Sequence, residues 1–392
     1  MTRPVNVIGI ARTPIGGLLG ALAEVSATAL GAVAIRAALE RAGVTPERVD
    51  EVLMGCVLPA GLGQAPARQA ALGAGLPETT PCTTVNKMCG SGMKTVMMGM
   101  DAIRAGTAEI VVAGGMESMS RAPYLLPNAR GGYRLGHGQV VDHMFLDGLE
   151  DAFEPGRLMG TYAEDCAAHY HFTREAQDSY AISSLERAKQ AIDAGAFRLE
   201  IAPVTYTTRR GQVSVDTDEQ PGSARIEKIP TLKPAFRDDG TVTPANSSSI
   251  SDGAAALVLA SDAAARELGV TPLARLDAHT SVAQAPGWFT TAPVGAIRRV
   301  LDTVGWGVGE VDLFEVNEAF AVVAMAAMAE LGIARERLNV HGGACALGHP
   351  IGASGARILV TLISALKQRR ASRGVASLCI GGGEATAVAL TA

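Results

Sequence analysis

The chain repeats one order of features, and this repetition restricts the folds open to it. In the first half, the turn Gly90-Ser91-Gly92 opens an apolar helix, and a strand then ends at Gly114-Gly115-Met116-Glu117. In the second half, a turn from Gly348 to Gly355 opens another apolar helix, and the next strand ends at Gly381-Gly382-Gly383-Glu384. Two segments that end alike suggest an internal duplication. Residue by residue the similarity is weak, so this prediction depends on the order of the elements.

Strands and helices alternate on both sides of the repeat. Apolar residues after Cys89 recur every three or four positions, which is the spacing of one helix face. Short apolar runs bounded by turns predict buried strands, and their alternation with helices predicts an α/β fold with a largely buried sheet. The strands expected in the first half are Val5 to Ile10, Val49 to Val57, Cys82 to Val85 and Ile110 to Ala113, with a helix from Ala27 to Ala42.

The texture of the sequence changes between about residues 121 and 248, where glycine, proline, charged and aromatic residues are more frequent. A chain of 392 residues exceeds one core of ordinary size. We therefore predict a first domain from 1–120 plus 249–270, an inserted loop domain at 121–248 with binding duties, and a last domain at 271–392.

Composition excludes several classes of function. The net charge of -5 argues against nucleic-acid binding. The longest apolar run, Ala319 to Ala329, is shorter than the roughly 20 residues that cross a bilayer. The six cysteines are scattered and form no Cys-x-x-Cys pair, which argues against zinc or a disulfide framework. Because the N-terminus also does not resemble a signal peptide, we expect a cytoplasmic protein without a membrane partner.

Four residues carry possible chemistry, although each has a simpler interpretation. Cys89 lies at the start of a helix, which favours the thiolate, and its neighbouring glycines leave N–H groups open to an oxyanion. It is equally compatible with a small buried residue. His349 fits a loop histidine, Asn317 a helix N-cap, and Cys379 a buried strand residue.

Taken together, the motifs resemble those of the thiolase family, in the same order and with the same long separations. The matching segments are Asn86-Lys87-Met88-Cys89-Gly90-Ser91-Gly92, Asn317-Glu318-Ala319-Phe320, Gly348-His349-Pro350 and Cys379-Ile380-Gly381-Gly382-Gly383. The resemblance runs the length of the chain. It implies the thiolase fold, in which two similar βαβαβαββ halves form a five-layered α-β-α-β-α core with an inserted loop domain.

The resemblance also implies a mechanism without a metal or redox cofactor. Cys89 would attack an acyl-CoA thioester while His349 takes its proton, and Cys379 would remove or return a proton at the α-carbon of the second acyl-CoA. By analogy, His349 and a water held by Asn317 stabilise the enolate, and the N–H groups of Cys89 and Gly381 stabilise the tetrahedral intermediate. The reaction would be a reversible Claisen condensation of two acetyl-CoA to acetoacetyl-CoA and CoA.

Two segments resemble those of the short-chain members of the family. Arg130 to Gly136, continued through Asp147 to Leu149, is similar to their tetramerisation segment, which implies a homotetramer built as a dimer of dimers. Met159-Gly160-Thr161 is similar to the segment that limits acyl length. The residues that the resemblance implies for substrate and CoA binding are Ser248, Met159, Leu158, Ala319, Phe320 and Arg225.

Three departures from the family pattern leave chain length and the CoA contacts open. Leu158 stands where a histidine is frequent, and Gln220-Pro221-Gly222 lacks an arginine that commonly meets the nucleotide, with Arg225 the nearest candidate. Glu384-Ala385-Thr386 stands where Gln-Gly or Met-Gly is common.

Other functions remain as alternatives. A degradative 3-ketoacyl-CoA thiolase of broader chain length shares these motifs, as does a non-catalytic thiolase-like protein that binds acyl-CoA or lipid. The presence of all four expected catalytic residues argues against the second. A nucleotide-binding dehydrogenase is excluded because no Gly-x-Gly-x-x-Gly turn with an acidic partner is found. The histidine pair of carrier-protein condensing enzymes is not matched.

Overall fold

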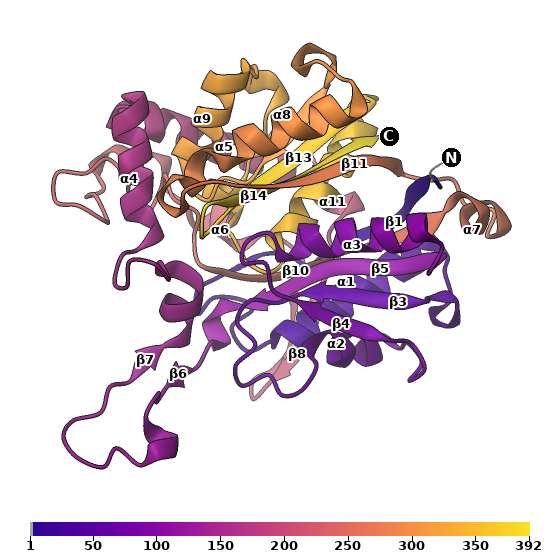
Figure 1. Cartoon of the computed structure of the whole chain (residues 1–392), viewed down its shortest axis with the longest axis horizontal. Helices are drawn as coiled ribbons and strands as arrows, with labels where there is room; N and C mark the ends of the chain where they lie inside the picture. Colours follow the sequence, from indigo (N-terminus) through magenta and orange to yellow (C-terminus); the bar gives the residue numbers. More distant parts are fainter. Residues whose placement is uncertain (1–2) are drawn as a thin grey trace.

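The computed structural model describes residues 3–392 and is built on a ten-stranded mixed sheet (Figure 1). Along this sheet the strands follow the order β12-β13-β14-β11-β1-β10-β5-β3-β4, and β2 pairs with β10. The strands are β1 (Val5–Arg12), β2 (Gly16–Gly17), β3 (Glu51–Gly55), β4 (Cys82–Val85), β5 (Ile110–Ser118), β10 (Ser251–Ser261), β11 (Ala274–Ala283), β12 (Leu313–Val316), β13 (Arg373–Ile380) and β14 (Glu384–Thr391).

The sheet consists of two halves with the same topology. The orders β3-β5-β10-β1 and β12-β13-β14-β11 each begin with a parallel pair and continue with two antiparallel pairings. The halves join where Val5–Val7 of β1 pairs antiparallel with Ala274–Leu276 of β11. The predicted α/β fold with an internal duplication is therefore confirmed.

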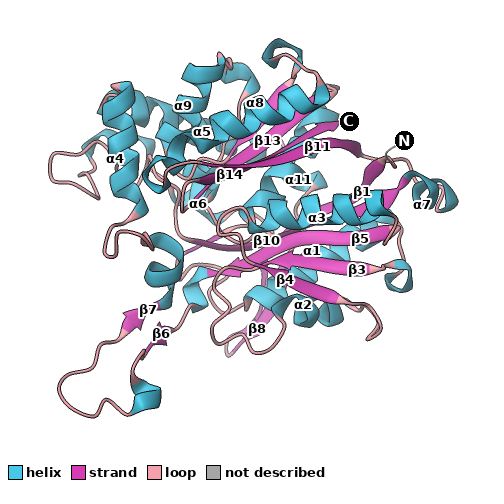
Figure 2. Cartoon of the chain, viewed as in Figure 1, coloured by secondary structure: helices cyan, strands magenta, loops and turns pink. Residues whose placement is uncertain are grey.

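The two half-sheets and the helices around them stack in five layers, in the order helix, sheet, helix, sheet, helix (Figures 1 and 2). Helices α1 (Ala27–Ala42) and α2 (Pro66–Ala74) cover one outer face, and α8 (Ala292–Val304) and α9 (Ala321–Leu331) cover the other. Helices α3 (Ser91–Ala105) and α11 (Ser354–Arg369) pack against each other between the two half-sheets. Every residue of α11 from 354 to 366 is buried, because protein surrounds this helix on all sides.

A long excursion separates β5 from β10, whereas the matching strands β13 and β14 are joined by three glycines alone. The excursion contains the hairpin of β6 (Tyr124–Leu125) and β7 (Val141–Asp142), helices α4 (Met159–Tyr170), α5 (Arg174–Asp193) and α6 (Glu219–Ser223), and the hairpin of β8 (Val204–Thr208) and β9 (Gly211–Val215). The short helices α7 (Asp262–Glu267) and α10 (Ala344–Leu347) follow in the remaining chain. The exact domain boundaries stay a prediction.

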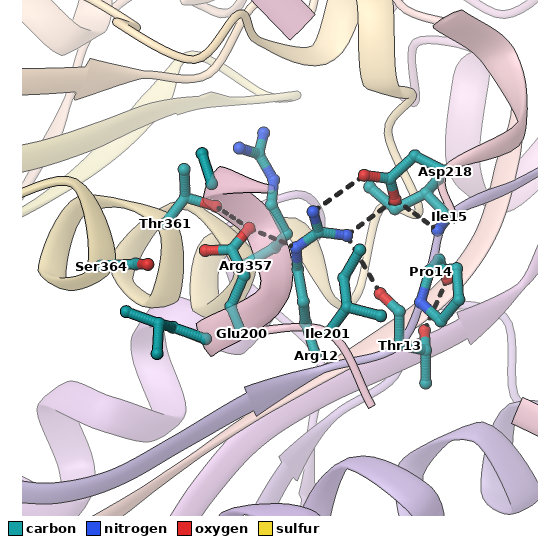
Figure 3. A network of polar contacts seen from close by, with 12 residues as sticks. Arg12, Thr13, Pro14, Ile15, Glu200, Ile201, Asp218, Arg357, Thr361 and Ser364 are labelled. Atoms are coloured by element: carbon teal, nitrogen blue, oxygen red, sulfur yellow. Dashed lines mark hydrogen bonds and ion pairs between the residues drawn. The ribbon is translucent and has the colours of Figure 1, made fainter. Parts of the chain in front are cut away.

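A buried charge network ties this excursion to the sheet (Figure 3). The guanidinium of Arg12, at the end of β1, is fully buried, and it donates to Glu200 at 2.7 Å and to both oxygens of Asp218 at 2.7 and 2.8 Å. Two carboxylates beside Arg12 offset part of the desolvation of each charge. Arg357 of α11 reaches the same region, so three parts of the chain meet there.

Within residues 3–392, no helix combines the length and the hydropathy needed to cross a membrane. The same residues contain no group of three or more His, Cys, Asp or Glu side chains placed to hold a metal ion.

Candidate active site

Cys89 lies in a tight turn, two residues before Ser91, the first residue of α3. The Met88 N–H donates to the side-chain oxygen of Asn86 at 3.0 Å, and the Lys87 N–H donates to the Ser91 hydroxyl at 2.8 Å. Met88 has a φ of 48°, a left-handed conformation that costs a non-glycine residue roughly 1–2 kcal/mol. The turn thus holds a strained backbone that presents the cysteine at the helix N-terminus.

The turn that carries His349 packs backbone to backbone against the cysteine turn and the end of β5. A Cβ on Gly92 would lie 2.8 Å from the Ala356 nitrogen, and a Cβ on Gly115 would lie 2.0 Å from the Gly352 oxygen. Since real Cβ atoms do not approach within 3.0 Å, only glycine fits at these two positions. The two halves therefore meet at the turns that carry Cys89 and His349.

Cys379 and Gly381 lie beside Cys89. Burial raises the pKa of the Cys89 thiol to about 11, and the nearby N–H groups of Gly381 and of Cys89 itself oppose that shift. The Cys379 thiol is also buried, and its pKa is raised by this burial first and then by the proximity of Cys89. The two sulfurs thus lie close together, near the N–H groups of Cys89 and Gly381.

His349 is buried and electrically neutral in this site. Its Nδ1 lies 2.6 Å from the hydroxyl of Ser354 and 3.5 Å from the side-chain nitrogen of Asn317. Burial, followed by the charge of Arg357, lowers the pKa of His349 to about 3. Its Nε2 is buried and has no partner within residues 3–392. With one nitrogen held and the other free, this imidazole has the geometry of a proton acceptor, while its lowered pKa disfavours the protonated form.

Asn317 does not cap a helix, which corrects the simpler interpretation of this residue. It follows β12, and α9 begins only at Ala321. Its N–H donates to the Ser377 oxygen at 3.0 Å, and its side-chain oxygen has no partner among the described residues. The neighbouring Glu318 is fully buried and accepts four donors at 2.7 to 3.1 Å, namely Tyr180, Ser184, Asn339 and the Cys345 N–H. This network orients the turn that carries Asn317.

Glu117 connects the two halves below the site. Its buried carboxylate accepts the N–H groups of Val57 at 3.0 Å, Leu58 at 3.2 Å and Gly352 at 3.0 Å. Burial raises the pKa of Glu117 to about 7, and these donors oppose that shift. Because Gly352 is three residues after His349, this carboxylate helps to place the histidine turn.

A cleft of about 360 Å³ opens beside the histidine turn, between the inserted region and α10. Arg225 and Lys228 stand on its wall, and Ser249 and Cys345 line it further along. The Ser249 oxygen accepts the His349 N–H at 3.1 Å, so the cleft borders the buried histidine. The positive charges of these two side chains suit the binding of a phosphorylated ligand.

The remaining predicted residues lie around this site. Met159, at the start of α4 and directly after its N-cap Leu158, has its sulfur 3.5 Å from where a Cβ on Gly381 would stand. The Ser248 N–H donates to the Ala319 oxygen at 2.9 Å. The buried ring of Phe320 packs edge-on against Phe236, with centroids 6.0 Å apart, and Phe236 also contacts Gly160.

Sequence reasoning missed the residues that support these side chains. Ser354, Glu117 and Glu318 all lie inside or beside quoted motifs, but no role was predicted for them. Each is a polar residue within an apolar stretch of sequence. A polar side chain that is buried in this way needs hydrogen-bond partners inside the protein, and this need was the available signal. The identity of those partners is visible only in the fold.

The fold and the site define a duplicated α/β protein with two cysteines and a neutral histidine at the junction of its halves. Comparison with protein families gives the same result. The thiolase N-terminal domain matches residues 5–263, and the thiolase C-terminal domain matches residues 270–392. This chain belongs to the thiolase family.

Similar proteins match the chain over nearly its whole length. Acetyl-CoA acetyltransferase 1 of Arabidopsis thaliana is 53% identical over 99% of this chain and 94% of its own. Acetyl-CoA acetyltransferase of Pseudomonas aeruginosa is 50% identical over 98% of each chain. Among solved structures, acetyl-CoA acetyltransferase from Syntrophomonas wolfei has a TM-score of 0.96 and 39% identity, with 100% of both chains covered.

Proposed function

We propose that this chain is an acetyl-CoA C-acetyltransferase, which catalyses the reversible condensation of two acetyl-CoA to acetoacetyl-CoA and CoA. The names of its similar proteins support this substrate. The observation that carries the proposal is the placement of the Cys89 sulfur against the Gly381 N–H, with the second thiol of Cys379 alongside.

In the first half-reaction, the Cys89 sulfur attacks the carbonyl carbon of acetyl-CoA, and its proton moves to Nε2 of His349. The carbonyl oxygen takes the place of the sulfur as acceptor of the Cys89 and Gly381 N–H groups, each worth about 100- to 1,000-fold in rate. The C–S bond to CoA then breaks, and the departing sulfur takes the proton of Cys379. The products are acetyl-Cys89, free CoA, a protonated His349 and a Cys379 thiolate.

In the second half-reaction, the Cys379 thiolate removes a proton from the α-carbon of a second acetyl-CoA. The resulting enolate oxygen lies toward His349 and toward a water held by Asn317, whose side-chain oxygen is free within the described residues. The α-carbon attacks acetyl-Cys89, the thioester bond to Cys89 breaks, and His349 returns its proton to that sulfur. Splitting the transfer in two avoids one difficult step.

The cleft lined by Arg225 and Lys228 supports a path for CoA, and Ser248, bonded to Ala319, directly precedes its lining residue Ser249. Arg225 would meet the phosphorylated end, since no arginine occupies Gln220-Pro221-Gly222. Met159, beside Gly381, would close the acyl end and restrict the substrate to short chains. The steps use side chains and backbone groups of this chain, so we expect no metal or redox cofactor.

The hairpin of β6 and β7 projects from the body of the protein (Figure 1) and exposes several large apolar side chains. These are Tyr124, Leu126, Leu135 and Val140. Exposed apolar surface of this kind favours association with another protein surface. This surface supports a homotetramer built as a dimer of dimers. The six free cysteines separately support a cytoplasmic location, because the cytoplasm keeps thiols reduced.

The test is an activity profile of the purified protein. We expect condensation of acetyl-CoA, thiolysis of acetoacetyl-CoA, and loss of both in Cys89→Ala with the fold retained. Higher thiolysis of longer 3-ketoacyl-CoA substrates would replace the proposal with a degradative thiolase of broader range. Absence of both activities in the wild type would overturn it.

A further inference from the structure

Lys87 and Glu384 form an ion pair between the two catalytic turns, although 297 residues separate them in sequence. Lys87 lies two residues before Cys89. Glu384 is the first residue of β14 and directly follows the three glycines that begin at Gly381. Their side chains are 22% and 37% exposed, so the pair lies at the rim of the site and is partly shielded from water. Glu384 is also one of the positions where this chain departs from the family pattern.

The pair is one of three successive contacts between these turns. A Cβ on Gly90 would lie 2.4 Å from the Cδ1 atom of Ile380, so the cysteine turn rests on that side chain. Gly381 comes next along the chain, and its N–H is near enough to the Cys89 sulfur to lower the pKa of that thiol. Glu384 pairs across the hairpin with Ile380, and its carboxylate reaches Lys87. Packing, a backbone hydrogen bond and an ion pair thus follow one another along the hairpin.

In the turn that carries the Gly381 donor, Gly383 packs closely against the backbone of Gln284 and Ala285. Gly382 and Gly383 have φ values of 91° and 87°, and three consecutive glycines leave the backbone without side chains to pack. On the side away from Cys89, the Gln284 N–H donates to the Gly383 oxygen at 2.8 Å. On the side facing Cys89, the side-chain anchor at the end of the turn is Glu384.

We propose that Lys87 and Glu384 are positioning residues, whose ion pair holds the Gly381 N–H against the atom that reacts at Cys89. Neither side chain touches the reacting atoms in this account. The proposal rests on the proposed acetyl transfer, because it assigns the pair a role in forming acetyl-Cys89.

Loss of the ion pair should slow acetylation of Cys89 less than loss of the Gly381 N–H itself would. Removal of an oxyanion donor costs about 100- to 1,000-fold in rate. A half-exposed ion pair that aims the donor controls only part of that, so we expect acylation to slow by about threefold to tenfold. Since neither residue lines the CoA cleft, KM for acetyl-CoA should change by less than about twofold.

The experiment measures single-turnover acetylation of Cys89 in four variants. Lys87→Met and Glu384→Gln remove one charge each, the double variant removes both, and the charge swap Lys87→Glu with Glu384→Lys restores a pair in reverse. We expect each single variant to slow acetylation, the double variant to be no slower than the singles, and the swap to recover most of the rate. High salt should slow the wild type and leave the double variant unchanged.

The pair of Arg48 and Glu267 provides a matched control, because it also joins distant segments, at 2.8 Å, but lies on the surface away from both turns. Arg48→Met should leave the acetylation rate unchanged. Additive losses in the double variant, a change in KM alone, or single variants that acetylate at the wild-type rate would each overturn the proposal. A wild type that forms no acetyl-Cys89 would instead refute the proposed function. Thermal unfolding of each variant separates a misfolded protein from a misplaced donor.

Discussion

Substitution of Gly115 by alanine tests whether the site depends on backbone contact between the two halves. Gly115 lies in β5, which is hydrogen-bonded on both sides by β3 and β10. An added Cβ would stand 2.0 Å from the Gly352 oxygen and 3.0 Å from the Ala353 Cα. Because β5 is fixed between two strands, the turn bearing Gly352 has to move instead, by about 1 Å to reach the shortest distance that real Cβ atoms show.

This displacement affects both stability and rate. Overpacking of a buried position costs about 1–3 kcal/mol, of which alanine recovers about 0.4–1 kcal/mol through the unfolded state. We therefore expect the free energy of unfolding to fall by about 1–2 kcal/mol. Gly352 is three residues after His349, and a misplacement of about 1 Å in a catalytic group costs roughly 100-fold in rate.

The assay is kcat/KM for thiolysis of acetoacetyl-CoA, together with urea unfolding of the same sample. Gly309→Ala is the control, because a Cβ there meets nothing within 4 Å. It should leave both quantities unchanged. If Gly115→Ala retained the wild-type rate and stability, the two halves would not be held in backbone contact at the site, and this reasoning would be wrong.

Three further outcomes follow from the geometry. Ser354→Ala should lower kcat about tenfold, because it removes the hydroxyl that Nδ1 of His349 contacts. Ser354→Cys should recover part of the rate, and an unchanged kcat in Ser354→Ala would exclude this orienting role. Cys379→Ala should still acetylate Cys89, but more slowly, because the departing CoA sulfur loses its proton donor, and it should release no acetoacetyl-CoA. Mass spectrometry and a product assay measure both outcomes, and normal condensation would contradict the assignment. The rate of Cys89 alkylation by iodoacetamide should rise about tenfold per pH unit between pH 7 and pH 10. The reason is that burial raises the pKa of this thiol to about 11 and only the thiolate reacts. A rate that levels off near neutral pH would show that Cys89 is not a neutral thiol at that pH.

Much of the fold was predictable because its signals are local. Ala27–Ala42 and Cys82–Val85 have the bounds that their apolar patterns indicate, since glycine or a turn ends each run. The repeated order of turn, helix and strand also predicted two equivalent halves. The pairing of β1 with β11, which joins those halves, has no counterpart in any local pattern.

The site was less predictable, because its geometry depends on contacts over long separations. The resemblance to family motifs indicated that Cys89, His349 and Cys379 are catalytic. Composition and spacing alone were equally compatible with a purely structural role for each. Local pattern alone also allowed Asn317 to cap a helix, but four donors to the adjacent Glu318 hold that segment in a turn instead. Contacts such as that of Glu117 with Gly352 or of Lys87 with Glu384 require the folded chain to be seen.

The most direct test of the account is to identify which residue carries the acyl group. Brief exposure of the Cys379→Ala protein to acetyl-CoA, followed by rapid acid quench and peptide mass spectrometry, should place one acetyl group on Cys89 and none on another cysteine. Acetylation at a different residue, or a protein that releases acetoacetyl-CoA with no acetyl group ever detected on Cys89, would contradict a site built around this cysteine.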